Sequence, residues 1–153
     1  MGVSFGKTYS IGNNHNRLWT LGNDRGKTFE DNIHKYIKLL CIGNQNIQID
    51  QTPAVYDGGK DVIIKFKGDS LSLFGITFKS HGNEETTIYI ECKSTDQNKL
   101  RREKFYPTID NVIHADSKID YFVLLTNSVI LAKDHYHVKK DLEKIRAEFV
   151  LID

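Results

Sequence analysis

Residues 86–93, TTIYIECK, combine β-branched and aromatic side chains with an acid and a lysine at the end of the run. This composition predicts a β-strand. Alternate side chains of a strand share a face, so Glu91 and Lys93 point the same way and Cys92 points into the opposite layer. An acid and an ammonium at the end of an apolar strand are costly to bury unless they are paired or bound to something. The pair is therefore the first candidate functional feature.

Two further strand-like runs precede this one and are separated from it by turn residues. They cover Asp61–Phe66 and Leu71–Phe78, and Ile47 and Ile49 indicate another short strand before them. Their β-branched and aromatic content and their short spacings predict an antiparallel meander.

A helix is predicted ahead of the strands, beginning near Thr28 and stopping at Gly43-Asn44. Its apolar residues recur with the spacing of one helical face. They are Phe29, Ile33, Tyr36, Ile37, Leu40 and Cys41.

The C-terminal part of the chain alternates predicted helices and strands. Residues 98–112 predict a helix that Pro107 interrupts or ends. Residues 121–125 form a continuous apolar run, which is typical of a strand covered on both faces. A second amphipathic helix starts near Lys133, with one side marked by Val138, Leu142, Ile145 and Phe149, and residues 149–152 form a closing strand.

This order of elements predicts an α/β fold with a mixed β-sheet flanked by helices. We divide the chain into an N-terminal arm or extension, residues 1–27, which is rich in Gly and Asn, and a domain over residues 28–153. The 153 residues are enough for one domain with a sizeable core.

Composition excludes several classes of protein. The chain has 21 Lys and Arg against 20 Asp and Glu, so a net charge of +1 offers no general attraction to nucleic acid. Mean hydropathy is −0.43, and no apolar run is long enough for a membrane helix. Residues 1–7 lack the pattern of a signal peptide. Cys41 and Cys92 lie among aliphatic residues, as small buried hydrophobes do, so we expect a reducing, cytoplasmic setting.

The acids suggest a metal site. If Asp61 lies on a strand beside Glu91, the two carboxylates can share a hard divalent cation. Oxygen ligands and an incomplete protein cage suit Mg²⁺, with phosphate and water completing the shell. The ion would lower the pKa of a bound water. Lys93 would orient that water or stabilise developing charge.

Asp61 followed by Glu91-Cys92-Lys93 resembles the D…(D/E)-x-K signature of the PD-(D/E)xK nuclease superfamily. Three further features resemble its Mrr-like restriction endonuclease branch. These are the Phe-Glu pair in residues 28–30, the sequence DGGKDV at residues 57–62, and the closing strand–helix–strand order.

The resemblance implies a restriction-endonuclease-like core and an Mg²⁺- or Mn²⁺-dependent endonuclease. Such an enzyme hydrolyses DNA phosphodiester bonds, and restriction-modification or antiviral defence is the expected role. The family pattern implies that Asp61 and Glu91 are metal ligands, that Cys92 adds its backbone carbonyl, that Lys93 is the catalytic lysine and that Glu30 is an accessory acid.

The chain departs from the branch in two respects. The gap between Asp61 and Glu91 is long, so residues 71–78 are either an insertion at the turn or a strand that separates the two acids. The branch also often carries Gln at the acid position.

Two alternatives compete with an active nuclease. Glu91 and Lys93 could form an edge-strand ion pair facing solvent, which would add little stability. The chain could also be a catalytically inactive nuclease-fold module for nucleic-acid binding or oligomeric assembly.

Nucleic-acid contacts are expected from a basic cluster after the acid-x-Lys strand, comprising Lys99, Arg101, Arg102 and Lys104. Binding through them would weaken with salt; the competing interpretation is a solvated helix face. Tyr106 beside the cluster is expected to pack in the core rather than stack on a base. DNA is the expected partner, together with a second copy of the chain or a regulatory sensor domain or partner. The i, i+2 spacing of His135 and His137 argues against a zinc site.

Overall fold

The computed structural model describes residues 7–9, 32–39, 45–51, 62–82, 84–93, 99–114 and 118–152. Six strands form a mixed sheet in the order β1-β8-β7-β6-β3-β2, and two strands form a separate sheet, β4-β5. The strands are β1 (Lys7–Tyr9), β2 (Ile47–Gln51), β3 (Val62–Phe66), β4 (Ser70–Leu73), β5 (Ile76–Lys79), β6 (Thr86–Lys93), β7 (Tyr121–Thr126) and β8 (Glu148–Ile152). The labelled helices are α3 (Arg102–His114) and α4 (Ala132–Glu143). The α/β class and the mixed sheet are therefore as predicted.

The C-terminal half of the sheet is parallel, because a helix crosses over between each pair of consecutive strands. β6 pairs with β7 and β7 with β8, both parallel, and α3 and α4 make the two connections. On its other side β6 pairs antiparallel with β3. β6 is therefore an interior strand of the sheet.

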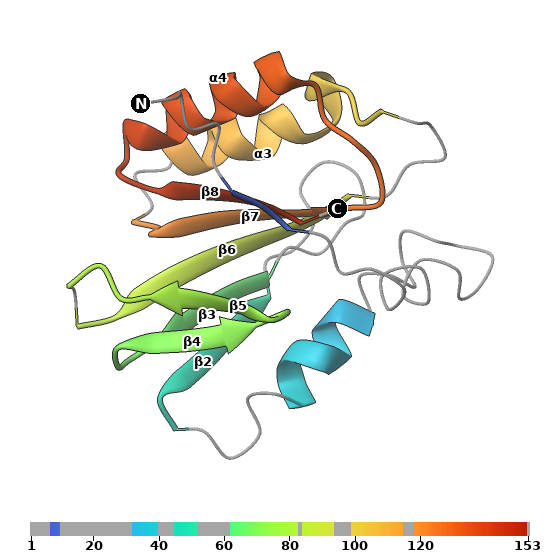
Figure 1. The fold of residues 1–153 in the computed structure, drawn as a ribbon. Coiled ribbons are helices and arrows are strands. Elements are labelled where there is room, and N and C mark those ends of the chain that lie inside the picture. The colour runs from blue at the N-terminus through green and yellow to red at the C-terminus, as the bar shows by residue number, and fades with distance from the viewer. Residues whose placement is uncertain are drawn as a thin grey trace.

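The large sheet has an apolar layer on each face, and α3 and α4 cover one of the two faces (Figure 1). One layer lies beneath α3 and α4 and includes Phe122 and Leu124 of β7. The other includes Val123 and Leu125 of the same strand. Successive side chains of a strand face opposite sides, so the unbroken apolar run of β7 fills both layers, as predicted.

Residues 32–39 form a helix on the face opposite α3 and α4 (Figure 1). Ile33 and Ile37 are fully buried there, which confirms part of the predicted apolar face. The proposed start at Thr28 and the stop at Gly43-Asn44 lie outside the described residues.

The single strand predicted over residues 71–78 is wrong, because the chain reverses in its middle. Phe74 and Gly75 have positive φ angles of 55° and 74°, and they form the turn between β4 and β5. Positive φ at both central residues gives a two-residue hairpin turn its twist. β3 pairs directly with β6, so this hairpin is an insertion between them and the predicted meander is also wrong.

Pro107 neither interrupts nor ends its helix. α3 runs from Arg102 to His114 with Pro107 inside it. The ring removes one backbone donor and opposes helical geometry. Burial of Phe105, Ile109 and Val112 on the inward face outweighs that cost.

Residues 7–9 lie within the predicted N-terminal arm, yet they form strand β1 at the edge of the large sheet. β1 pairs with β8 in parallel, with Thr8 opposite Leu151. None of the helices among the described residues is long and apolar enough to cross a lipid bilayer.

Candidate functional site

Glu91 and Lys93 lie on the same face at the C-terminal end of β6, as strand alternation predicts. Lys93 Nζ is 3.7 Å from Glu91 Oε1. Only 1% of the Glu91 side chain and 13% of the Lys93 side chain are exposed. An ion pair so far from water interacts strongly, because solvent screens it little.

The pair is not an edge-strand ion pair facing solvent. β6 lies between β3 and β7, and Glu91 is opposite Leu124 in the parallel register. Leu124 is buried in the layer beneath α3 and α4. The carboxylate therefore lies between the sheet and the helical layer.

Thr108 of α3 completes the surroundings of the acid. Its hydroxyl donates a hydrogen bond of 2.8 Å to Glu91 Oε1, the oxygen that also faces Lys93. Sequence reasoning did not select Thr108. The sequence does contain a signal for it. Thr108 is next to Ile109 and three residues after Phe105, and both of these lie on the inward face of α3.

Cys92 is buried in the layer opposite Glu91, as predicted for a small apolar side chain. Because its side chain is turned away from Glu91 and Lys93, its backbone carbonyl is the part that could serve a ligand on their side of the sheet.

Asp61 and Glu30 lie outside the described residues. Val62, which follows Asp61, is paired with Ile90, which precedes Glu91. The helix of residues 32–39, which follows Glu30, packs on the face opposite Glu91.

Within the described ranges, no group of three or more His, Cys, Asp or Glu side chains is placed to hold a metal ion. Glu91 alone of the two predicted carboxylate ligands is described. A carboxylate and a backbone carbonyl are the donor types that Mg²⁺ prefers, but they leave the set incomplete without Asp61.

The predicted basic cluster is exposed. Its members, Lys99, Arg101, Arg102 and Lys104, lie at the start of α3 and just before it. The guanidinium of Arg102 lies 4.1 Å from the ring centre of Tyr106, a cation–π contact. Tyr106 itself is buried, which confirms that it packs in the core.

His135 and His137 of α4 do not share a helical face, in agreement with their spacing. His135 is buried and its ring packs edge-on against Phe149 at 4.9 Å, whereas His137 is exposed. Burial, together with the charge of Lys139, lowers the pKa of His135 below its usual 6.5. His135 is therefore a core residue whose surroundings disfavour the charged form.

His81 lines two cavities, with volumes of about 310 and 240 Å³. They lie at the opposite end of the strands from Glu91. Asp120 also lines the larger one and Tyr121 lines the smaller one. Sequence reasoning assigned nothing to these side chains, because they come from separate segments that only folding brings together.

No protein-family model and no curated protein matches this chain.

Proposed function

We propose that the chain is a metal-dependent endonuclease that hydrolyses DNA phosphodiester bonds. The observation that carries the proposal is the buried Glu91–Lys93 pair at the C-terminal end of β6. Carboxyl ends of parallel strands in α/β sheets commonly carry ligand sites. The spacing Glu91-Cys92-Lys93 is that of the family signature, and β6 is an interior strand of the sheet.

The direct pairing of β3 with β6 supports a role for Asp61. A separating strand would have placed the two acids too far apart to share one ion. The β4–β5 hairpin instead lies outside this pairing, and Val62 is opposite Ile90. Asp61 and Glu91, with the Cys92 carbonyl, would then hold Mg²⁺ or Mn²⁺.

The proposed cation would lower the pKa of a coordinated water and neutralise charge on the phosphate. Lys93 would orient the attacking water and stabilise negative charge developing on the phosphate oxygens. Glu30 would contribute as an accessory acid. The Thr108 hydroxyl would hold the Glu91 carboxylate in one orientation.

DNA contacts are assigned to the exposed basic residues around the start of α3, which are Lys99, Arg101, Arg102 and Lys104. α3 carries Arg102 and Lys104 of this cluster as well as Thr108, so one helix would connect the DNA backbone with the catalytic acid. Since net charge is only +1, a second copy or another partner would strengthen binding. A cytoplasmic role in restriction or antiviral defence belongs to this proposal.

One observation favours a second candidate, a catalytically inactive module for nucleic-acid binding or assembly. Glu91 is only 1% exposed and receives the Thr108 hydroxyl as well as the Lys93 ammonium. A carboxylate enclosed in this way can stabilise the fold without taking part in catalysis.

A plasmid cleavage assay separates the two candidates. With Mg²⁺ or Mn²⁺ the protein should nick or linearise supercoiled DNA, and EDTA should abolish the activity. Lys93→Met, Glu91→Gln and Asp61→Asn should each lower cleavage at least about a hundredfold, as expected when a charge-stabilising group is lost.

Matched controls are Lys133→Met and Asp110→Asn, which alter exposed residues of α4 and α3. They should cut at the wild-type rate. Each variant is first checked for native circular dichroism, because Glu91 and Lys93 are also structural partners. Folded Lys93→Met protein that cleaves at the wild-type rate would disprove the proposal, and DNA binding without cleavage by the wild type would favour the inactive module.

A further inference from the structure

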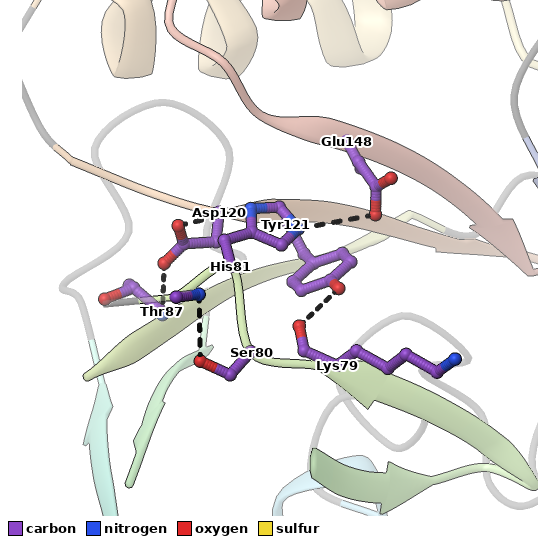
Figure 2. Close-up of polar contacts among 8 residues, drawn as sticks. Lys79, Ser80, His81, Thr87, Asp120, Tyr121 and Glu148 are labelled. Atoms are coloured by element: carbon purple, nitrogen blue, oxygen red, sulfur yellow. Dashed lines mark hydrogen bonds and ion pairs between the residues drawn. The ribbon is translucent and has the colours of Figure 1, made fainter. Parts of the chain in front are cut away.

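One histidine connects the two sheets. His81 lies in the turn after β5, between two carboxylates (Figure 2). Its Nδ1 is 3.4 Å from Asp120 Oδ1, and its Nε2 is 3.6 Å from Glu148 Oε2. Asp120 immediately precedes β7, and Glu148 is the first residue of β8. A single imidazole ring therefore links the end of the β4–β5 hairpin to the beginnings of two strands of the other sheet.

The Asp120 carboxylate is fixed independently of the histidine. Its Oδ2 accepts a hydrogen bond of 2.9 Å from the backbone N–H of Thr87, and only 6% of the side chain is exposed. A buried carboxylate held by one neutral donor gains from a cation at its other oxygen. His81 is 27% exposed, so its ring can exchange a proton with solvent.

A second contact at this junction carries no net charge. The hydroxyl of Tyr121 donates a hydrogen bond of 2.6 Å to the backbone carbonyl of Lys79. Its ring packs edge-on against Phe78 at 5.1 Å and lies 4.7 Å from the His81 ring. The hydrogen bond of Tyr121 and its contact with Phe78 do not involve the imidazole proton.

We propose that His81 is a proton-operated clamp that fastens the β4–β5 hairpin to the large sheet through Asp120 and Glu148. An imidazolium donates from both ring nitrogens, so it can serve both carboxylates at once. A neutral imidazole has one N–H, and its other nitrogen presents a lone pair to a carboxylate. Loss of the proton therefore removes one of the two links and makes its geometry repulsive.

Other charges surround the clamp. Two cations, Lys118 and Arg146, line the 310 Å³ cavity with His81. Lys79 lines the neighbouring cavity with Glu148. Asp120 and Glu148 lie at ion-pair distance from the ring.

Release of the clamp would extend to the other end of the hairpin. Phe74, at the hairpin turn, stacks on Tyr36 of the helix at residues 32–39, with 5.0 Å between ring centres. The backbone N–H of Phe74 also donates a 3.1 Å hydrogen bond to the Tyr36 hydroxyl. Loosening the hairpin at His81 therefore weakens the packing of the helix at residues 32–39 against the hairpin turn. This inference is independent of the nuclease proposal.

Amide hydrogen exchange measured residue by residue tests the clamp. The reporter is the Ser80 N–H, which donates to the Asp69 carbonyl at the base of the hairpin. The reference is the amide of Val123 in the buried strand β7. After correction for intrinsic exchange, the opening constant at Ser80 relative to Val123 should rise about three- to tenfold from about pH 5.5 to about pH 8.

His81→Gln should abolish this dependence and open the hairpin at both pH values. Glu148→Gln, at a side chain that is 57% exposed and thus tolerant of change, should reduce the dependence without affecting the fold. His137→Gln, at an exposed histidine of α4, should retain it in full. A pH-independent ratio in the wild type, or a dependence that survives in His81→Gln, would overturn the proposal.

Discussion

Thr108 of α3 donates its hydroxyl to Glu91 Oε1 of β6 over 2.8 Å, and the same oxygen faces Lys93 Nζ at 3.7 Å. The helical layer is thereby joined to the sheet at a buried charge. An acid in this position must be satisfied by its neighbours, because transfer of an isolated carboxylate from water is expensive. The candidate catalytic acid and the helix–sheet interface are therefore one structural feature.

Thr108→Val should destabilise the protein by about 1–3 kcal/mol, since valine has nearly the same shape but leaves the buried carboxylate without that donor. Urea unfolding measures the loss. Thr108→Ser keeps a hydroxyl and serves as the control, with a cost of less than about 1.5 kcal/mol. Equal stability of the valine variant and the wild type would show that water replaces the hydroxyl.

Glu91 and Lys93 should show strong energetic coupling. Lys93→Met leaves a buried carboxylate without its ammonium partner, and Glu91→Gln removes the charge that the ammonium neutralises. The double variant should be more stable than the sum of the two single effects predicts, by about 1–3 kcal/mol. Urea unfolding of the wild type, the two single variants and the double variant measures this coupling. Effects that add to within about 0.5 kcal/mol would mean that the two side chains do not stabilise each other.

His135 should make the protein sensitive to acid. Burial lowers its folded-state pKa below 6.5, so the unfolded chain binds a proton at a pH where the folded protein does not. Its contribution to stability is full above about pH 7 and is lost as the pH falls through 6.5 towards the folded-state value. His135→Leu should flatten this part of the stability curve in denaturation measured at a series of pH values.

The exposed His137 provides the control for that experiment. His137→Gln should leave the acid sensitivity of the wild type in place. If His135→Leu retains the same slope between about pH 7 and pH 5, another group is responsible.

Tyr121 should make the protein sensitive to alkali. Burial and the nearby Glu148 carboxylate raise its pKa to about 12 from 10.0. Between these values the unfolded chain ionises and the folded protein does not, so the stability that the phenol contributes below pH 10 declines as the pH rises towards 12. A rise of the pKa from 10.0 to about 12 corresponds to at most about 2.7 kcal/mol, and solvent screening lowers the loss relative to Tyr121→Phe to about 1–2 kcal/mol.

Denaturation of both proteins across this range measures the difference, since they differ at this one residue. Tyr121→Phe keeps the ring against Phe78 but loses the hydrogen bond to Lys79. At neutral pH it should therefore be less stable by about 1 kcal/mol. A constant difference from neutral to strongly alkaline pH would contradict the raised pKa.

Pro107→Ala should stabilise the protein by about 1–2 kcal/mol. Alanine restores an N–H that can donate to the carbonyl of Glu103 and removes the clash of the proline ring. Pro107 is exposed, so its replacement leaves no cavity. Asn111→Ala, at another exposed position of α3, shares only the gain in helix propensity and should add about 0.5 kcal/mol. Thermal unfolding checks both, and a less stable alanine variant at 107 would show that the helix depends on the proline.

The local pattern of residues was enough to place several elements and the orientation of the proposed pair. Strand alternation in TTIYIECK puts Glu91 and Lys93 on one face and Cys92 on the other, as found. The unbroken apolar run of β7 predicted a strand covered on both faces, and the spacing of Ile33 and Ile37 predicted a buried helical face, as found. These patterns can be read directly because the period of a strand or helix is a property of the backbone itself.

Contacts between distant segments settled the rest. Residues 71–78 form a hairpin rather than one strand, with a positive φ at Phe74 in the turn. The helix α3 continues past Pro107 because its inward face is buried. Whether Glu91 faced solvent or a helix depended on how many strands flank β6 and on where Thr108 docks. His81, Asp120 and Glu148 come from three separate segments of the chain. The periodicity of the sequence within any one segment does not predict that they lie together. Such pairings follow from the free energy of packing the whole chain, to which each local preference adds only a small part.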